Sequence, residues 1–218
     1  LDDYSGLAMY WSRWNSSDAW DRAIERQKEG VQLAEAIESD RLVEMLSRQG
    51  AIELSASRNA DAAETFKRIV NLTPDDTMAL NNYAYLLSTL AGKPSEALPY
   101  AQTAIRLAPE NPAIIDTMAT IQSQLGNHDA ALTGRLKQLE YQPKDPELMG
   151  KIAMLYLDHT DTPQQAMKFA EQASKLRPRD AVLLDVEGWA AFKNGREAKG
   201  EDLILQSIRR QPTARAHL

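Results

Sequence analysis

The segment Pro74–Pro109, PDDTMALNNYAYLLSTLAGKPSEALPYAQTAIRLAP, contains the pattern that decides the fold. Its flanking proline recurs toward the carboxyl end of the chain. Intervals of 35, 34, 35 and 34 residues separate Pro74, Pro109, Pro143, Pro178 and Pro212. Self-similarity at this period is typical of a stack of one supersecondary unit. Nothing in an ordinary helical bundle would make the prolines recur in phase, so the period predicts an all-α solenoid.

Two apolar stripes accompany each proline. The first stripe lies six, nine, ten and thirteen residues after the proline, on one face of a helix: Leu80, Tyr83, Ala84 and Leu87 in this segment. The second lies twelve, eight and five residues before the next proline: Ala97, Ala101 and Ala104. Each unit is therefore expected to form two helices.

Small residues mark where the two helices should meet. The tenth residue after each proline and the twelfth before the next are Ala or Gly in every unit, for example Gly188 and Gly200. Antiparallel helices approach closely only where no bulky side chain intervenes. Proline ends the second helix, because it lacks an N–H and keeps its predecessor out of the helical region.

At these positions the chain resembles the tetratricopeptide repeat family, and it looks like large bacterial members of that family. The resemblance implies a right-handed superhelical solenoid of antiparallel helix pairs. We expect five tandem units at residues 41–74, 75–109, 110–143, 144–178 and 179–212. The extra residue of the two 35-residue units is predicted in the turns Leu90–Pro94 and His159–Pro163, because turns tolerate insertions.

The two ends differ from the repeat. Residues 1–40 are predicted to form an atypical helix pair, with Tyr4 to Trp11 in its first helix and a second helix from Ser17 or Asp18 to about Ser39. Residues 213–218 read as the start of a truncated further repeat. Since the chain also begins with Leu1, we expect it to be part of a longer repeat protein.

Two local features are ambiguous or minor. Arg135 and Gln138 occupy stripe positions that are apolar or small in most units, while Leu132, Leu136 and Leu139 are displaced by one residue. Either the helix is rotated or Arg135 reaches an acidic partner. Just after the prolines, Asp75, Asp76 and Glu110 are interpreted as helix caps.

Composition and motifs argue against several classes of protein. The formal net charge of -6 does not favour nucleic-acid binding, and the absence of cysteine excludes disulfides and thiolate metal sites. No apolar run is long enough to insert into a membrane. No phosphate loop, nucleophile motif or zinc spacing occurs, so we expect neither an enzyme nor a cofactor. Bacterial cytoplasm and periplasm or envelope both remain open as locations.

The resemblance also implies a concave groove lined by the first helix of each unit, about seven, eleven and fifteen residues after each proline. The candidate residues at or beside these positions are Asn81, Asn82, Tyr85, Asp116, Thr120, Gln124, Lys151, Met154, Asp158, Asp185, Trp189 and Lys193, with Thr89 and Gly150 completing the pattern.

Amide and acidic groups beside the apolar bodies of Tyr85, Met154 and Trp189 are suited to an extended peptide, and the aspartates favour a basic or neutral one. Trp189 could equally pack against a following repeat. The chaperone-binding clamp of the family, which holds a terminal carboxylate, is matched at one position in five.

Three functional hypotheses follow. The first is a non-enzymatic scaffold or adaptor that binds a peptide or protein segment in the groove. The second is a self-assembly module, and the third is a docking or regulatory arm of a larger enzyme.

Overall fold

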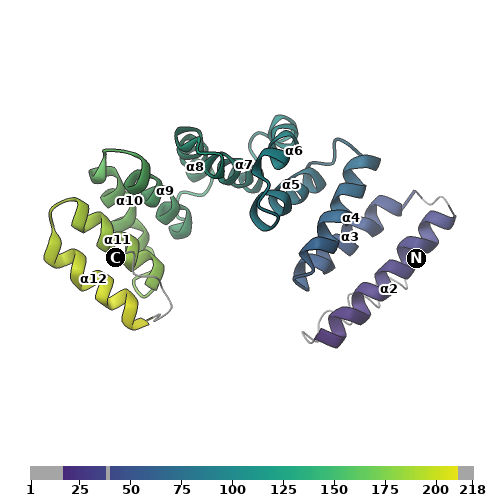
Figure 1. Ribbon diagram of the computed structural model, residues 1–218, viewed down its shortest axis with the longest axis horizontal. Coiled ribbons are helices and arrows are strands. Elements are labelled where there is room, and N and C mark those ends of the chain that lie inside the picture. Colours follow the sequence, from purple (N-terminus) through teal and green to yellow (C-terminus); the bar gives the residue numbers. More distant parts are fainter. Residues whose placement is uncertain (1–16, 38–39, 211–218) are drawn as a thin grey trace. The chain divides into compact units, whose positions relative to one another are not determined.

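The computed structural model describes residues 17–37 and 40–210, and these residues are helical with short connections. No strand occurs among them. The chain divides into two compact units, one up to Leu125 and one from Gly126 (Figure 1), and each is described by itself. The prolines at 74, 109, 143 and 178 all lie between helices. The five-unit division remains a proposal.

Within the described residues, the first unit contains one long helix followed by shorter ones. Its elements are α2 (Ser17–Ala36), α3 (Leu42–Ser55), α4 (Asn59–Leu72), α5 (Thr77–Tyr85), η1 (Leu86–Leu90), α6 (Pro94–Leu107) and α7 (Pro112–Gln124). Each helix packs mainly on its neighbours in sequence, and α5 also contacts α7. This nearest-neighbour packing is what a solenoid requires.

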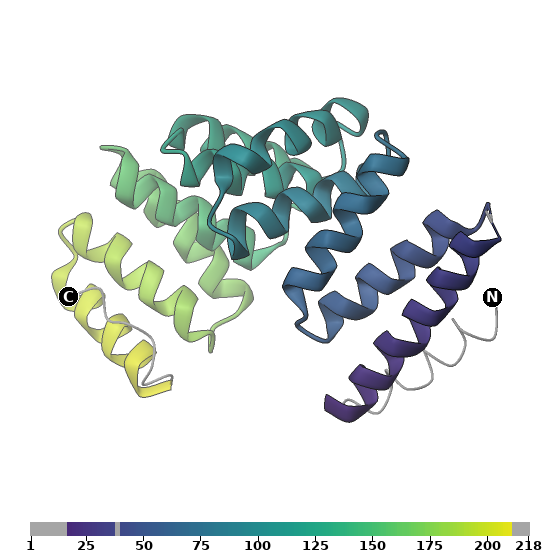
Figure 2. The ribbon, with the colours of Figure 1, turned by 45° about the vertical axis from the view of Figure 1, so that its right-hand side comes forward.

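The second unit repeats the same arrangement. Its helices are α8 (His128–Tyr141), α9 (Pro146–His159), α10 (Pro163–Leu176), α11 (Ala181–Lys193) and α12 (Glu197–Arg210). Figures 1 and 2 show α11 and α12 side by side. Helix α9 packs on α10, and it also contacts α11, the first helix of the following pair. The surface shared by α9 and α11 is where the candidate site lies.

The small residues bring paired helices together, as predicted. A Cβ atom built on Gly200 would lie 2.8 Å from the Gly188 carbonyl oxygen, so α11 and α12 nearly touch through their backbones. In other units Ala84, Ala97 and Ala153 are fully buried at equivalent positions. The close approach of each pair therefore depends on side chains no larger than a methyl group.

The first helices carry a recurrent cap that our prediction identified only once. Asp76, Asn111, Asp145 and Asp180, each two residues after a proline, accept hydrogen bonds from the first backbone N–H groups of α5, α7, α9 and α11. Asp76 was predicted correctly. Asp75 and Glu110 are not the capping residues, because each precedes the residue whose side chain reaches the free N–H groups.

The extra residue of the 35-residue units does not lie in the turn, which corrects our prediction. The loops before α6, α8, α10 and α12 all contain three residues, and the added residue extends the preceding helix. In the first case it forms the π-helical turn η1, where the Ala91 N–H donates to the Leu86 carbonyl at 3.1 Å. A π turn accommodates one more residue without lengthening the connection.

Two regions depart from the repeat pattern in sequence: α8 and the amino end. Arg135 and Gln138 are both buried, so α8 keeps the common register. At the same time Leu132, Leu136 and Leu139 pack against the core of the second unit. At the amino end, α2 begins at the predicted residue and ends at Ala36. The predicted helix at Tyr4 to Trp11 and the predicted repeat start at 213–218 lie outside the described residues.

Candidate functional site

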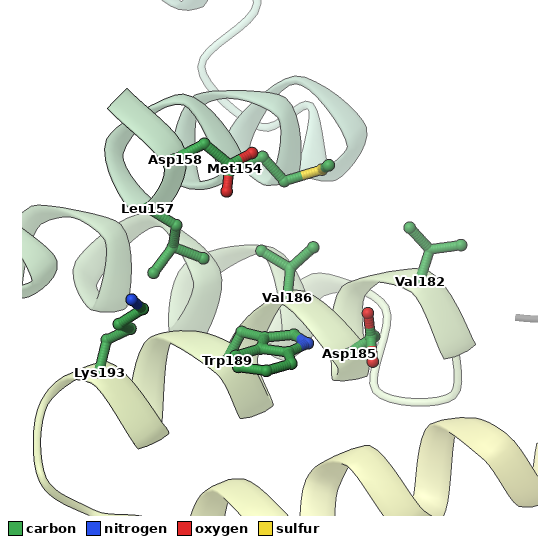
Figure 3. A pocket seen from close by; sticks show the side chains of 8 residues that line it. All are labelled: Met154, Leu157, Asp158, Val182, Asp185, Val186, Trp189 and Lys193. Atoms are coloured by element: carbon green, nitrogen blue, oxygen red, sulfur yellow. The ribbon is translucent and has the colours of Figure 1, made fainter. Parts of the chain in front are cut away.

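A groove of about 470 Å³ lies between α9 and α11 in the second unit (Figure 3). Helix α9 contributes Met154, Leu157 and Asp158, and helix α11 contributes Val182, Asp185, Val186, Trp189 and Lys193. Five of these eight residues are candidates from the sequence. The spacing of seven, eleven and fifteen residues after the proline therefore identified one face of both helices.

Backbone packing sets the distance between the two walls of the groove. Gly150 on α9 is buried, and a Cβ atom there would lie 2.7 Å from Leu183 Cδ2 on α11. Gly150 was expected to face the groove, and the structure instead places it at the contact between the helices. Its missing side chain lets α11 approach α9, so that residues one turn further along can share a groove.

Trp189 lies at the centre of the α11 wall, between Lys193 and Asp185 (Figure 3). Its indole packs edge to face on Phe192, with ring centroids 6.0 Å apart and an interplanar angle of 72°. The indole Nε1 is buried and has no hydrogen-bond partner. The polar atom of Trp189 is thus covered, and the exposed part of the ring is carbon.

Charged side chains border this apolar surface. Asp158 and Lys193 are exposed, Asp185 is half-buried, and all three line the groove. Asp158 and Lys193 form no ion pair with any of the described residues. The groove therefore offers two carboxylates and one ammonium around Met154, Leu157, Val186 and Trp189.

The remaining candidates do not line this groove. Lys151 pairs with Glu147 on the same helix at 3.2 Å. Asn81, Asn82 and Tyr85 are on α5, and Asp116, Thr120 and Gln124 are on α7, all in the first unit.

Helices α5 and α7 of the first unit are in contact, and a partly buried hydrogen bond joins η1 to α7. The Ser88 hydroxyl donates to the Gln124 side-chain oxygen. Tyr85, one turn before Ser88, is 44% exposed. The first unit thus presents an exposed aromatic side chain, while the Gln124 oxygen is engaged within the protein.

Three residues of the groove were missed by the sequence analysis. Leu157, Val182 and Val186 supply much of its apolar lining. Val182 lies four residues after Pro178, one turn before Asp185, so the predicted stripe could have been extended by one turn. Leu157 and Val186 are neighbours of predicted residues, and nothing in their spacing distinguishes them from core positions.

Possible metal ligands do not cluster in the part of the chain that the structure describes. No group of three or more His, Asp or Glu side chains in residues 17–37 and 40–210 is arranged to bind a metal ion. His128 and His159 stack on one another, with centroids 3.3 Å apart. None of the helices in the described ranges is long and apolar enough to cross a lipid bilayer.

One buried carboxyl group serves the packing of α3 on α4. Glu53 is inaccessible to solvent and accepts hydrogen bonds from Gln49 Nε2 at 2.8 Å and Thr65 Oγ1 at 2.7 Å. Burial raises the pKa of Glu53 above its ordinary value of 4.5, although both hydrogen bonds act in the opposite direction. Because its side chain is fully buried, Glu53 is part of the core.

Comparison with known proteins supports the repeat assignment. No protein-family model matches the chain. The chain is 25% identical over 173 residues to TPR repeat-containing protein PA4667 of Pseudomonas aeruginosa, covering 76% of this chain and 28% of that protein. It therefore spans less than a third of the length of this curated relative.

Solved structures share the fold at low sequence identity. PilW, a widely conserved type IV pilus biogenesis factor, superimposes with a TM-score of 0.79 and 16% identity over 99% of this chain and 95% of its own. A tetratricopeptide repeat protein from Parabacteroides merdae gives 0.77 and 18% identity over 96% of this chain and 80% of its own. MamA from Desulfovibrio magneticus superimposes with a TM-score of 0.70 and 12% identity over 81% of this chain and 98% of its own. Together with the 34-residue period and the antiparallel helix pairs, these similarities show that the chain has the tetratricopeptide repeat fold.

Proposed function

We propose that this protein is a non-enzymatic interaction scaffold that binds a segment of a partner protein in the groove between α9 and α11. The observation that carries the proposal is the convergence of Met154, Trp189 and three charged side chains on one groove of about 470 Å³. Volumes between about 300 and 1,000 Å³ are typical of ligand sites. This groove could hold a few side chains of a partner.

The chemistry of the groove favours a peptide over a small polar metabolite. Its surface is more apolar than polar and includes the indole of Trp189, which can anchor one or two side chains, and charged groups lie beside it. The groove is not an enclosed cavity, so an extended segment does not have to thread into it. An extended segment would place alternate side chains on the apolar surface and keep the others in water.

The similar proteins support a scaffold role. The curated relative and the solved neighbour from Parabacteroides merdae are both repeat proteins. Scaffolds of this architecture act through extended surfaces.

A randomised peptide library tests the proposal directly. Peptides of about ten residues, which span about 33 Å when extended, would be selected on the intact chain and on two variants. Trp189→Ala removes the aromatic anchor, whereas Tyr141→Ala removes an aromatic side chain that is 41% exposed on α8 and lies outside the groove. Circular dichroism establishes that each variant is folded.

The selected peptides should bind Trp189→Ala about tenfold or more weakly, a loss of about 1.4 kcal/mol, and should bind Tyr141→Ala as they bind the parent. Equal binding to Trp189→Ala and the parent would refute the proposed groove. Loss of a concentration-dependent oligomer in Trp189→Ala, with no peptide selected, would assign the groove to self-assembly instead.

A further inference from the structure

We propose that the segment bound between α9 and α11 presents a lysine or arginine side chain to Trp189, Asp158 and Asp185. This inference rests on the proposed peptide-binding function and specifies the chemistry of the ligand. Three features of the groove support it: the exposed carbon surface of Trp189, the positions of the two carboxylates, and the position of the Lys193 ammonium group.

Trp189 can offer a ligand only its ring. The indole Nε1 is covered by protein, and no acceptor bonds to it, so hydrogen bonding to an incoming peptide is excluded in this conformation. The carbon surface of the indole lines the groove. An aromatic face is electron-rich and attracts a cation placed over it, and indole does so more strongly than phenol or benzene rings.

Carboxylates from both helices accompany this ring. Asp185 precedes Trp189 by four residues, which puts both side chains on the same face of α11. Asp158 projects from the facing helix α9 (Figure 3), and none of the described cations pairs with it. A guanidinium or ammonium group in the groove would therefore gain from the ring and from negative charge on both walls.

Lys193 places a positive charge at one end of the groove. It follows Trp189 by four residues on α11, and its ammonium lies on the side of the indole away from Asp185 (Figure 3). Because like charges repel, a ligand cation is favoured toward Asp185 and disfavoured toward Lys193. Carbonyl oxygens or an acidic side chain of the same segment fit the Lys193 end.

The alternatives fit the charges less well. An acidic segment would face two carboxylates across the groove, and a purely apolar one would leave Asp158 and Asp185 beside it with reduced hydration. Arginine satisfies the ring and the carboxylates at once, since its planar guanidinium can stack and donate hydrogen bonds in its own plane.

Peptide pools with one defined position provide the test. The central residue is fixed as Arg, Lys, citrulline, Leu or Glu, and the flanking residues are randomised. Citrulline keeps the shape of arginine without its charge. Affinities are measured for the parent, for a double variant Asp158→Asn with Asp185→Asn, for Trp189→Ala, and for Asp161→Asn, an exposed carboxylate outside the groove.

We expect the Arg and Lys pools to bind the parent about tenfold more tightly than the citrulline pool, with a preference that weakens as salt is added. The double variant should lose this preference and still bind the Leu pool. Asp161→Asn should behave as the parent.

The outcomes separate this inference from the function on which it rests. If Arg and citrulline pools bind the parent equally while Trp189→Ala abolishes binding, the basic-ligand inference is wrong and the groove stands. The same holds if the Glu pool binds best. If no pool distinguishes the parent from Trp189→Ala, the groove function fails, and this inference fails with it.

Discussion

The contact between α11 and α12 offers a sharp test of the packing. Gly200 on α12 faces Gly188 on α11, and a Cβ atom at Gly200 would lie 2.8 Å from the Gly188 carbonyl oxygen and 3.1 Å from the Phe192 backbone nitrogen. Both neighbouring atoms belong to the backbone, so they can yield only if one helix moves. Gly200→Ala should therefore destabilise the α11–α12 pair.

Gly150→Ala is the matched control. The Cβ atom at Gly150 would also be too close to a neighbour, at 2.7 Å, but that neighbour is Leu183 Cδ2, the end of a side chain that can rotate. Replacing a helical glycine by alanine gains up to about 1 kcal/mol of helix propensity in either case. Overpacking against fixed atoms costs about 1 to 3 kcal/mol.

The propensity gain largely cancels when the two variants are compared. The free energy of unfolding of Gly200→Ala should thus be about 1 to 3 kcal/mol below that of Gly150→Ala. Urea unfolding followed by circular dichroism at 222 nm measures the difference. Hydrogen exchange should localise the loss to α11 and α12, because repeat units contact only their neighbours. If Gly200→Ala is as stable as Gly150→Ala, the close approach of the two backbones is wrong.

Two further predictions concern a buried acid and a helix cap. Because the folded-state pKa of Glu53 is raised, its contribution to stability is fully present below about pH 4.5 and is lost as pH rises through the raised value. The stability of Glu53→Gln relative to the parent should therefore increase from pH 4 to pH 7, as paired urea titrations would measure. A stability difference that stays the same at both pH values would contradict a raised pKa of Glu53. Asp145 accepts from the N–H groups of Glu147 and Leu148 at 2.9 and 3.1 Å, so Asp145→Ala should cost about 0.5 to 2 kcal/mol in the same assay. The exposed loop variant Asp161→Ala should change stability by less than about 0.5 kcal/mol, and an equal effect of both would argue against the cap.

The sequence alone was sufficient for the helix pairs. Proline restricts its own backbone and that of its predecessor, and apolar stripes follow the helical period, so both signals are local and readable without coordinates. The small residues at Gly188 and Gly200 added the contact between paired helices, because only one arrangement of two antiparallel helices uses them. The sequence predicted that polar residues after the prolines cap the helices, but it did not tell Asp75 and Glu110 from the residues one position later that form the caps.

The lining of the groove follows in part from the same local signals. Met154 and Asp158 lie on one face of α9, and Asp185, Trp189 and Lys193 lie on one face of α11, as the helical period predicts. That these residues bind a ligand remains a proposal. These residues share one groove because α9 lies close to α11. The same approach adds Leu157, Val182 and Val186 to the lining and leaves Lys151 outside it. Gly150 permits that approach through its contact with Leu183, which is a residue of another helix.

The tertiary structure alone decided the features that depend on contacts between residues far apart in the chain. The burial of Arg135 and the covered nitrogen of Trp189 are of this kind. The sequence by itself determined the repeat period and its helices, because backbone restriction and helical periodicity act over a few residues. Packing acts across helices, so the distance between two faces, and hence the groove, appears only when they are folded together.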